Sequence, residues 1–170
     1  MSPLSSFSAS ILRTTVQTRM SYPELVVAFE SALGRWEPSV AKRLVQSRAT
    51  WAEVRREVSQ VSEPRGLMII SQADQGALTS LSGVQKQCKL YLVGNPVIAS
   101  EILAIDPRAS LYVPFRVCLY QEAEAVSGSI SYDRPSSSLA TLGRAELADV
   151  GLLLDGKIDD LATTLAEIGF

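Results

Sequence analysis

The segment from Lys89 to Pro135 constrains the fold more than any other part of the sequence. It reads KLYLVGNPVIASEILAIDPRASLYVPFRVCLYQEAEAVSGSISYDRP. This order of apolar runs and turn signals predicts a strand, an Asn-Pro turn, a short helix, an Asp-Pro turn, a long strand, an acidic connection and a further strand. A short helix placed between strands in this way favours an α+β domain.

The long strand, which we expect over residues 109–122, divides into two faces because successive side chains of a strand point to opposite sides. One face is wholly apolar and should lie against the core: Leu111, Val113, Phe115, Val117 and Leu119. The other face carries Tyr112, Pro114, Arg116, Cys118 and Tyr120. Proline has no amide hydrogen, so Pro114 should place this strand at a sheet edge or at a bulge.

The remaining elements follow from periodicity and turn signals. Ser21 and Glu24 form a capping box, which predicts a helix that starts at Tyr22. The other expected elements are a flexible tail over residues 1–10, strands at 11–18, 67–70, 87–93 and 126–133, and additional helices at 38–62 and 136–168. Gly143 and Asp155-Gly156 should divide the last helical region into three.

These elements predict a single α+β domain over residues 11–170. Its sheet should be mainly antiparallel, with about five strands and with helices packed on one face. A chain of 170 residues, of which 46% are hydrophobic, is long enough to bury one real core.

The absence of histidine is the strongest chemical constraint. Histidine is the commonest general base near neutral pH and the commonest metal ligand. Its loss removes serine and cysteine triads in their usual form, zinc clusters and facial iron triads. Nothing in the sequence resembles the spaced acidic loop that hard cations require. We therefore expect no metal site and no cofactor.

Charge and hydropathy exclude two classes of partner. The 16 basic and 18 acidic residues give a net charge of -2, so no basic field draws the chain to nucleic acid. No apolar run approaches the roughly 18 residues of a membrane span.

Cys88 and Cys118 lie in apolar runs, which favours buried free thiols in a reduced, cytoplasmic protein. A disulfide would require their strands to be neighbours in suitable register.

The central segment resembles the domain-of-unknown-function family 302, which has the TT1751-like fold. The motifs that carry the resemblance are Gly94-Asn95-Pro96, Asp106-Pro107, Val113-Pro114-Phe115-Arg116-Val117 and Ser131-Tyr132-Asp133-Arg134-Pro135. Family members often carry an aspartate-histidine pair ahead of the second helix, where this chain has Asp74-Gln75. A histidine-based role is therefore not carried over. The resemblance implies the fold and a homodimer, and it implies no settled activity.

The second face of the long strand is the candidate binding surface, with Tyr112, Arg116 and Tyr120 on it. Tyr91 of the preceding strand should point the same way if the registers of the two strands agree. An arginine among tyrosines can hold a carboxylate or enolate while the rings cover an apolar ligand. A subunit interface explains the same residues by packing alone. Asn95 has two interpretations, an amide that faces a ligand or a cap of the following helix.

Two functions remain open at this point. The first is a dimeric domain that binds a small apolar or anionic molecule, or a protein partner, through the Tyr/Arg face. The alternative is a cofactor-free, histidine-free isomerase, lyase or cyclase acting on a hydrophobic metabolite. In that case a tyrosine or a carboxylate would transfer the proton and an arginine would stabilise the developing negative charge.

Overall fold

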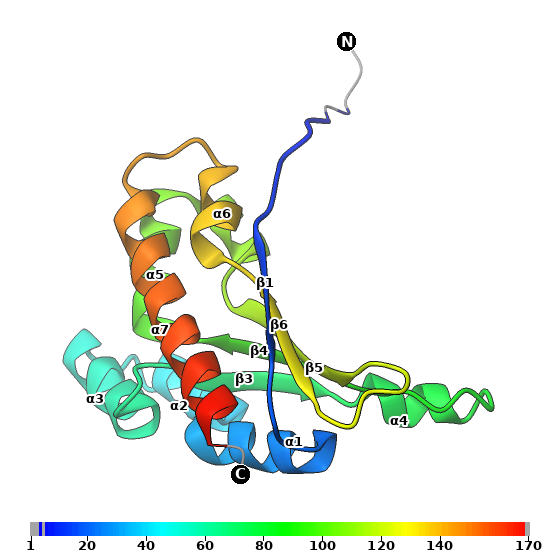
Figure 1. Ribbon diagram of the computed structural model, residues 1–170. Coiled ribbons are helices and arrows are strands. Elements are labelled where there is room, and N and C mark those ends of the chain that lie inside the picture. Colours follow the sequence, from blue (N-terminus) through cyan, green and yellow to red (C-terminus); the bar gives the residue numbers. More distant parts are fainter. Residues whose placement is uncertain (1–3, 5, 169–170) are drawn as a thin grey trace.

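The sheet at the centre of the molecule is mostly antiparallel, as predicted (Figure 1). The computed structural model describes residue 4 and residues 6–168. The strands are β1 (Arg13–Gln17), β2 (Gly34–Arg35), β3 (Met68–Ala73), β4 (Gln87–Gly94), β5 (Phe115–Gln121) and β6 (Ser129–Asp133). They form a six-stranded sheet in the order β1-β6-β5-β4-β3-β2, whereas about five strands were predicted. Among these strands only the short β2–β3 pair is parallel.

The described helices pack mainly against one face of this sheet. They are α1 (Tyr22–Ala32), α2 (Pro38–Gln46), α3 (Trp51–Ser62), α4 (Gln75–Ser80), α5 (Pro96–Ile105), α6 (Pro135–Ala140), α7 (Leu147–Glu167) and the 3-10 helix η1 (Pro107–Leu111). The main core joins apolar side chains of α1, α5, α6 and α7 to one face of the strands. Figure 1 shows the long α7 lying across the sheet. The predicted α+β class with helices on one face is thereby confirmed.

The capping box predicted at Ser21 and Glu24 is formed, and α3 begins with a second box of the same kind. The Ser21 amide donates to the Glu24 carboxylate at 2.9 Å, at the start of α1. The Thr50 amide donates to Glu53 at 2.7 Å and the Thr50 hydroxyl accepts from the Glu53 amide at 3.3 Å, at the start of α3. These bonds satisfy amide groups that have no partner inside the helix.

The prediction of one long strand over residues 109–122 is wrong in its first part. Residues 107–111 form the 3-10 helix η1, because the Asp106 side chain caps it by accepting from the Arg108 amide at 2.9 Å. Leu111 is consequently 68% exposed instead of lying in the core. Pro114 precedes β5, so the strand avoids the missing amide hydrogen and lies in the middle of the sheet, between β4 and β6.

The last helical region also differs from the prediction. Residues 147–167 form one 21-residue helix, α7, where a break at Asp155-Gly156 was expected. Asp155 is buried within this helix and accepts hydrogen bonds from Ser136 and Arg134, so it connects α7 to the start of α6. The break expected at Gly143 is present, since this residue has a positive φ of 69° between the two helices.

A second, smaller cluster lies beside the main core. Met68 points away from the main core and packs with Trp36, Leu44 and Val58. These residues come from β3, from the segment before α2, and from α2 and α3. The additional helices at 38–62 therefore enclose a small core of their own at the β2–β3 edge of the sheet.

The N-terminal segment precedes the first strand of the sheet. Residue 4 and residues 6–12 form neither helix nor strand, and the segment before Leu12 extends from the domain (Figure 1), whereas Leu12 itself bonds to Arg134 and Ser137. Residues 1–3 and 5 of the predicted tail lie outside the described residues. Among the described helices, none is both long and apolar enough to cross a membrane.

Candidate functional site

The sheet face opposite the main core carries the predicted Arg116 and Tyr120. The strand register aligns Thr15, Ser131, Cys118 and Leu90 in one row across β1, β6, β5 and β4. We call this surface the open face and define it by Arg13, Thr15, Cys88, Leu90, Arg116, Cys118, Tyr120, Glu122, Ser131 and Asp133. A shallow depression of about 610 Å³ lies over these residues.

The polar groups of the open face differ in whether they have partners. Arg13 forms an ion pair with Asp133 at 2.7 Å, and the hydroxyls of Thr15 and Ser131 form a hydrogen bond at 2.5 Å. Within the described residues, the guanidinium of Arg116 has no ion pair or hydrogen bond with another side chain or with the backbone. Arg116 is therefore a free cationic donor on this face.

Tyr91 does not lie on the open face. It pairs with Val117 of β5, so its side chain points into the main core, where it is fully buried against Phe29 with ring centroids 4.8 Å apart. Its hydroxyl donates to Glu30 at 2.8 Å, and Lys89 reaches the same carboxylate oxygen at 2.6 Å. Burial, and then the hydrogen bond to Glu30, raise the pKa of Tyr91 above its usual range. The structure makes Tyr91 a core residue.

Tyr112 is also separated from Arg116 and Tyr120. It follows η1 and precedes β5, and its hydroxyl accepts a hydrogen bond from the Thr141 hydroxyl at 2.8 Å, just after α6. The expected set of four residues therefore divides: Arg116 and Tyr120 share a surface, while Tyr91 and Tyr112 serve the packing of helices. The alternation of side chains along a strand did not predict the direction of Tyr112, because the strand begins only at Phe115.

The two cysteines lie on the open face as free thiols. Their strands are neighbours, but Cys88 pairs with Tyr120 and Cys118 pairs with Leu90, so the thiols are diagonal to each other instead of opposed. Burial raises the pKa of Cys118, which keeps the thiol protonated and unreactive at neutral pH. Cys118 is therefore not arranged as a nucleophile.

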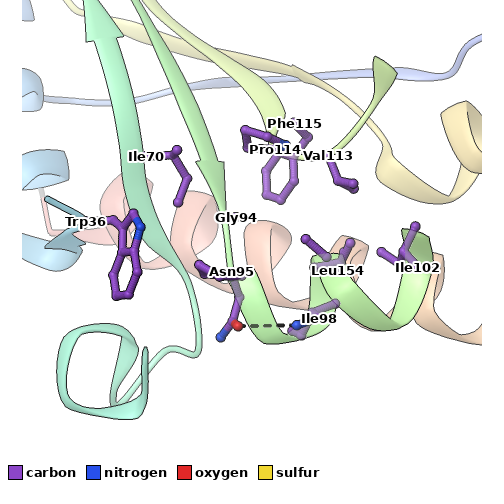
Figure 2. A pocket seen from close by; sticks show the side chains of 12 residues that line it. Trp36, Ile70, Gly94, Asn95, Ile98, Ile102, Val113, Pro114, Phe115 and Leu154 are labelled. Carbon is purple, nitrogen blue, oxygen red and sulfur yellow. Dashed lines mark hydrogen bonds between the residues drawn. The ribbon is translucent and has the colours of Figure 1, made fainter. Parts of the chain in front are cut away.

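An apolar cavity, which the sequence analysis did not find, lies where β4 ends and β5 begins (Figure 2). Its volume is about 140 Å³. The lining residues are Trp36, Ile70, Gly94, Asn95, Pro96, Ile98, Ala99, Ile102, Val113, Pro114, Phe115 and Leu154. None of these residues carries an ionisable side chain. The cavity offers an apolar space and no acid, base or nucleophile.

Asn95, the one residue of this lining with a polar side chain other than the indole, has a structural role. Its side-chain oxygen accepts from the amides of Val97 and Ile98 at 2.9 and 3.3 Å, and so caps α5. Its amide nitrogen donates to the Gly66 carbonyl at 3.1 Å. Both ends of the amide are therefore used inside the protein, which supports the capping interpretation over one in which Asn95 holds a ligand.

The comparisons with known proteins identify the family. The model of the family described as "Domain of unknown function DUF302" matches residues 44–168, well over half of the chain. The chain belongs to the DUF302 family. A solved structure, the uncharacterized conserved protein DUF302 from Bacillus stearothermophilus, is similar with a TM-score of 0.65 and 13% identity, over 92% of this chain and 99% of that one. At this identity the likeness shows the DUF302 fold alone. The comparison with curated proteins gives no match.

In this DUF302 chain the Ser131–Pro135 motif performs a structural task. The guanidinium of Arg134 contacts Asp155 at 3.1 Å and Asp159 at 2.6 Å, both on α7. The Tyr132 hydroxyl also donates to Asp159, and burial followed by this hydrogen bond raises the pKa of Tyr132. The motif thus fastens the end of β6 to the long helix that covers the sheet.

In the Asp74-Gln75 pair of this DUF302 chain, the aspartate likewise has a structural role. Asp74 accepts from the Ala77 amide at 2.8 Å and caps the short helix α4. Gln75 is the exposed first residue of that helix.

Proposed function

We propose that the chain is a homodimeric binding domain and that its open face is the surface on which the second copy docks. The observation that carries the proposal is the sheet face itself. Arg116 is a free cation there, Tyr120 lies beside it, and no helix of the main core covers this surface. Arg and Tyr are enriched in protein–protein interfaces because they combine packing with hydrogen bonding.

The composition of the open face fits an interface with an apolar centre and a charged rim. Cys88, Leu90, Cys118 and Tyr120 are half-buried in the free chain, and they lie together on the central strands β4 and β5. Arg13, Arg116, Asp133 and Glu122 surround them. Protein interfaces commonly have this arrangement, with charges depleted at the centre and retained at the rim.

The charges of the open face make it self-complementary. A two-fold axis brings the same patch of both copies together, so a face that carries both signs can pair with itself. Here Arg116 is the free cation, and Glu122 of the same depression has no ion pair among the described residues. An interface of two copies would give Arg116 an acidic partner that the single chain does not supply.

The shape of the open face favours a large partner over a small one. Small-molecule sites are concave and bury about 70–90% of their ligand. The depression over the open face is shallow and follows a sheet surface, so it would leave much of a small ligand in water. A second protein surface covers such an area completely.

Analytical ultracentrifugation tests the proposal directly. The wild-type chain should sediment as a dimer, and Leu90→Glu should raise the dimer dissociation constant at least about tenfold, because a carboxylate would be desolvated at the apolar centre. Arg116→Glu should weaken the dimer less, since Arg116 lies nearer the rim. Val45→Glu and Arg55→Glu, at exposed positions of α2 and α3, are the matched controls and should leave the dimer unchanged.

Two results would contradict the proposal. One is a wild-type chain that sediments as a monomer at concentrations of about 100 µM, well above the dissociation constants of specific dimers. The other is a Leu90→Glu variant that folds and dimerises like the wild type, which would place the interface elsewhere on the surface.

A further inference from the structure

We propose that the apolar cavity at the end of β4 is a binding site for a small, neutral, apolar molecule of about the size of benzene. The site is separate from the open face and does not depend on the dimer. Figure 2 shows its side chains converging from several elements: Trp36, Ile70 of β3, Ile98 and Ile102 of α5, Phe115 of β5 and Leu154 of α7.

The volume of the cavity sets the size of the ligand. The cavity measures about 140 Å³. An engineered apolar cavity of about 150 Å³ binds benzene or xenon and otherwise stays dry. Drug-sized ligands use pockets of about 300–1,000 Å³, so such molecules are too large for this one. A single aromatic ring or a short branched alkyl group fits.

The lining offers no partner to a charged ligand and few partners to water. A buried water typically needs about two to four polar partners. Asn95 has the only side-chain amide in the lining, and both of its ends already bond to the protein, to Val97 and Ile98 on one side and to Gly66 on the other. A neutral apolar occupant loses no hydrogen bonds in this space, whereas a carboxylate would lose its hydration without compensation.

The position of the cavity gives its occupant a structural effect. Trp36 and Ile70 belong to the small cluster under α2 and α3. Ile102, Val113, Phe115 and Leu154 belong to the main core. The cavity lies at the junction of the two clusters, so a ligand bound there contacts both and links the α2–α3 pair to the rest of the domain.

Benzene and toluene are the probes for the test, and benzoate is the charged control. Binding is measured from the methyl NMR shifts of Ile98, Ile102 and Leu154. A second readout is the fluorescence of Trp36 in a Trp51→Phe background, because Trp51 is exposed on α3 and would otherwise add its own signal. We expect benzene and toluene to shift all three methyl groups and to raise the melting temperature, and benzoate to do neither.

The matched variants are Ala99→Leu and Ala104→Leu, both on α5. Ala99 lines the cavity and Ala104 is exposed to solvent. A leucine at residue 99 should occupy the space and weaken benzene binding at least tenfold, while a leucine at residue 104 should leave binding unchanged. Ile98→Phe, at the same lining, gives a second filled cavity if Ala99→Leu does not fold.

Three outcomes would overturn the proposal. They are no methyl shift with benzene or toluene up to their solubility limits, equal binding of benzoate, and undiminished benzene binding by the folded filled-cavity variants. Because none of these measurements changes a residue of the open face, a monomeric wild-type chain that still binds benzene would refute the dimer and leave this site intact.

Discussion

Asp155 is the carboxylate that ties the last helix to the sheet. It is 3% exposed, and it accepts from the Ser136 amide at 3.0 Å, from the Ser136 hydroxyl at 2.5 Å and from Arg134 at 3.1 Å. Asp155→Ala should lower the free energy of unfolding by roughly 2–3 kcal/mol, because it leaves a half-buried amide and a half-buried guanidinium without this partner. Urea denaturation measures the loss.

A control for this variant lies on the same helix. Asp160 pairs with Arg65 at 3.0 Å, but its side chain is 75% exposed. Asp160→Ala should therefore cost less than about 0.5 kcal/mol. Equal losses in the two variants would mean that the network around Arg134 contributes nothing beyond an ordinary surface ion pair.

Asp106 should make the stability of the protein depend on pH. Hydrogen bonds from the Arg108 side chain and amide hold the pKa of this carboxyl well below its usual range. A depressed pKa stabilises the folded state at pH values above the unfolded-state pKa of about 3.9, and this contribution disappears as the pH falls through the folded-state pKa. The melting temperature of Asp106→Asn should thus lie below that of the wild type at pH 7, and the gap should narrow below pH 4.

Thermal melts of wild type and variant at pH 7 and pH 3 measure this gap. Glu101→Gln is the control, because Glu101 is exposed on α5 and has no ion pair among the described residues. A gap between wild type and Asp106→Asn that is the same at both pH values would show that the contact of Asp106 with Arg108 contributes through packing and not through charge.

At this scale the sequence predicted side-chain direction only where a strand was present. The alternation of side chains along the strand placed Val117 and Leu119 in the core and Arg116 outside it, as observed. It failed for Tyr91, because the direction of a side chain on one strand relative to the next depends on register, which a single sequence does not contain. The binding roles expected for Arg116 and Tyr120 stay predictions.

Among the elements, α5 depends on its cap. Asn95→Ala removes the acceptor for two amides at the start of α5 and also the bond to the Gly66 carbonyl. We expect a loss of about 1–2 kcal/mol in the free energy of unfolding. Asn95→Ser keeps a capping oxygen but cannot reach Gly66, so its loss should be smaller. Chemical denaturation of the three proteins separates the two contributions, and an Asn95→Ser loss as large as that of Asn95→Ala would show that capping is not the main one.

The start of an element was easier to predict than its end. A capping box is a local signal, so α1 starts at Tyr22, the residue predicted from Ser21 and Glu24. The continuation of α7 through Gly156 depends instead on buried contacts of Asp155 with a segment 19 residues earlier. Tertiary contacts of this kind override a local break signal.

For the whole molecule, the sequence was sufficient to predict the class of fold, but it predicted the candidate sites only in part. Alternation and turn signals are sufficient to predict a mainly antiparallel α+β domain. The apolar cavity has no signal of its own, because its lining comes from segments as distant as Trp36 and Leu154. Only the folded chain brings them together.

The pairing of β1 has a consequence for the order of events during synthesis. Among the described strands, β1 is hydrogen-bonded to β6 alone, and Arg13 lies opposite Asp133. β1 is translated before the other described strands, and its backbone groups stay unpaired until β6, the last of them, has been translated. Contacts so distant in sequence form slowly. Among the described strands, β1 is therefore the one that a chaperone of nascent chains would find unpaired for the longest time.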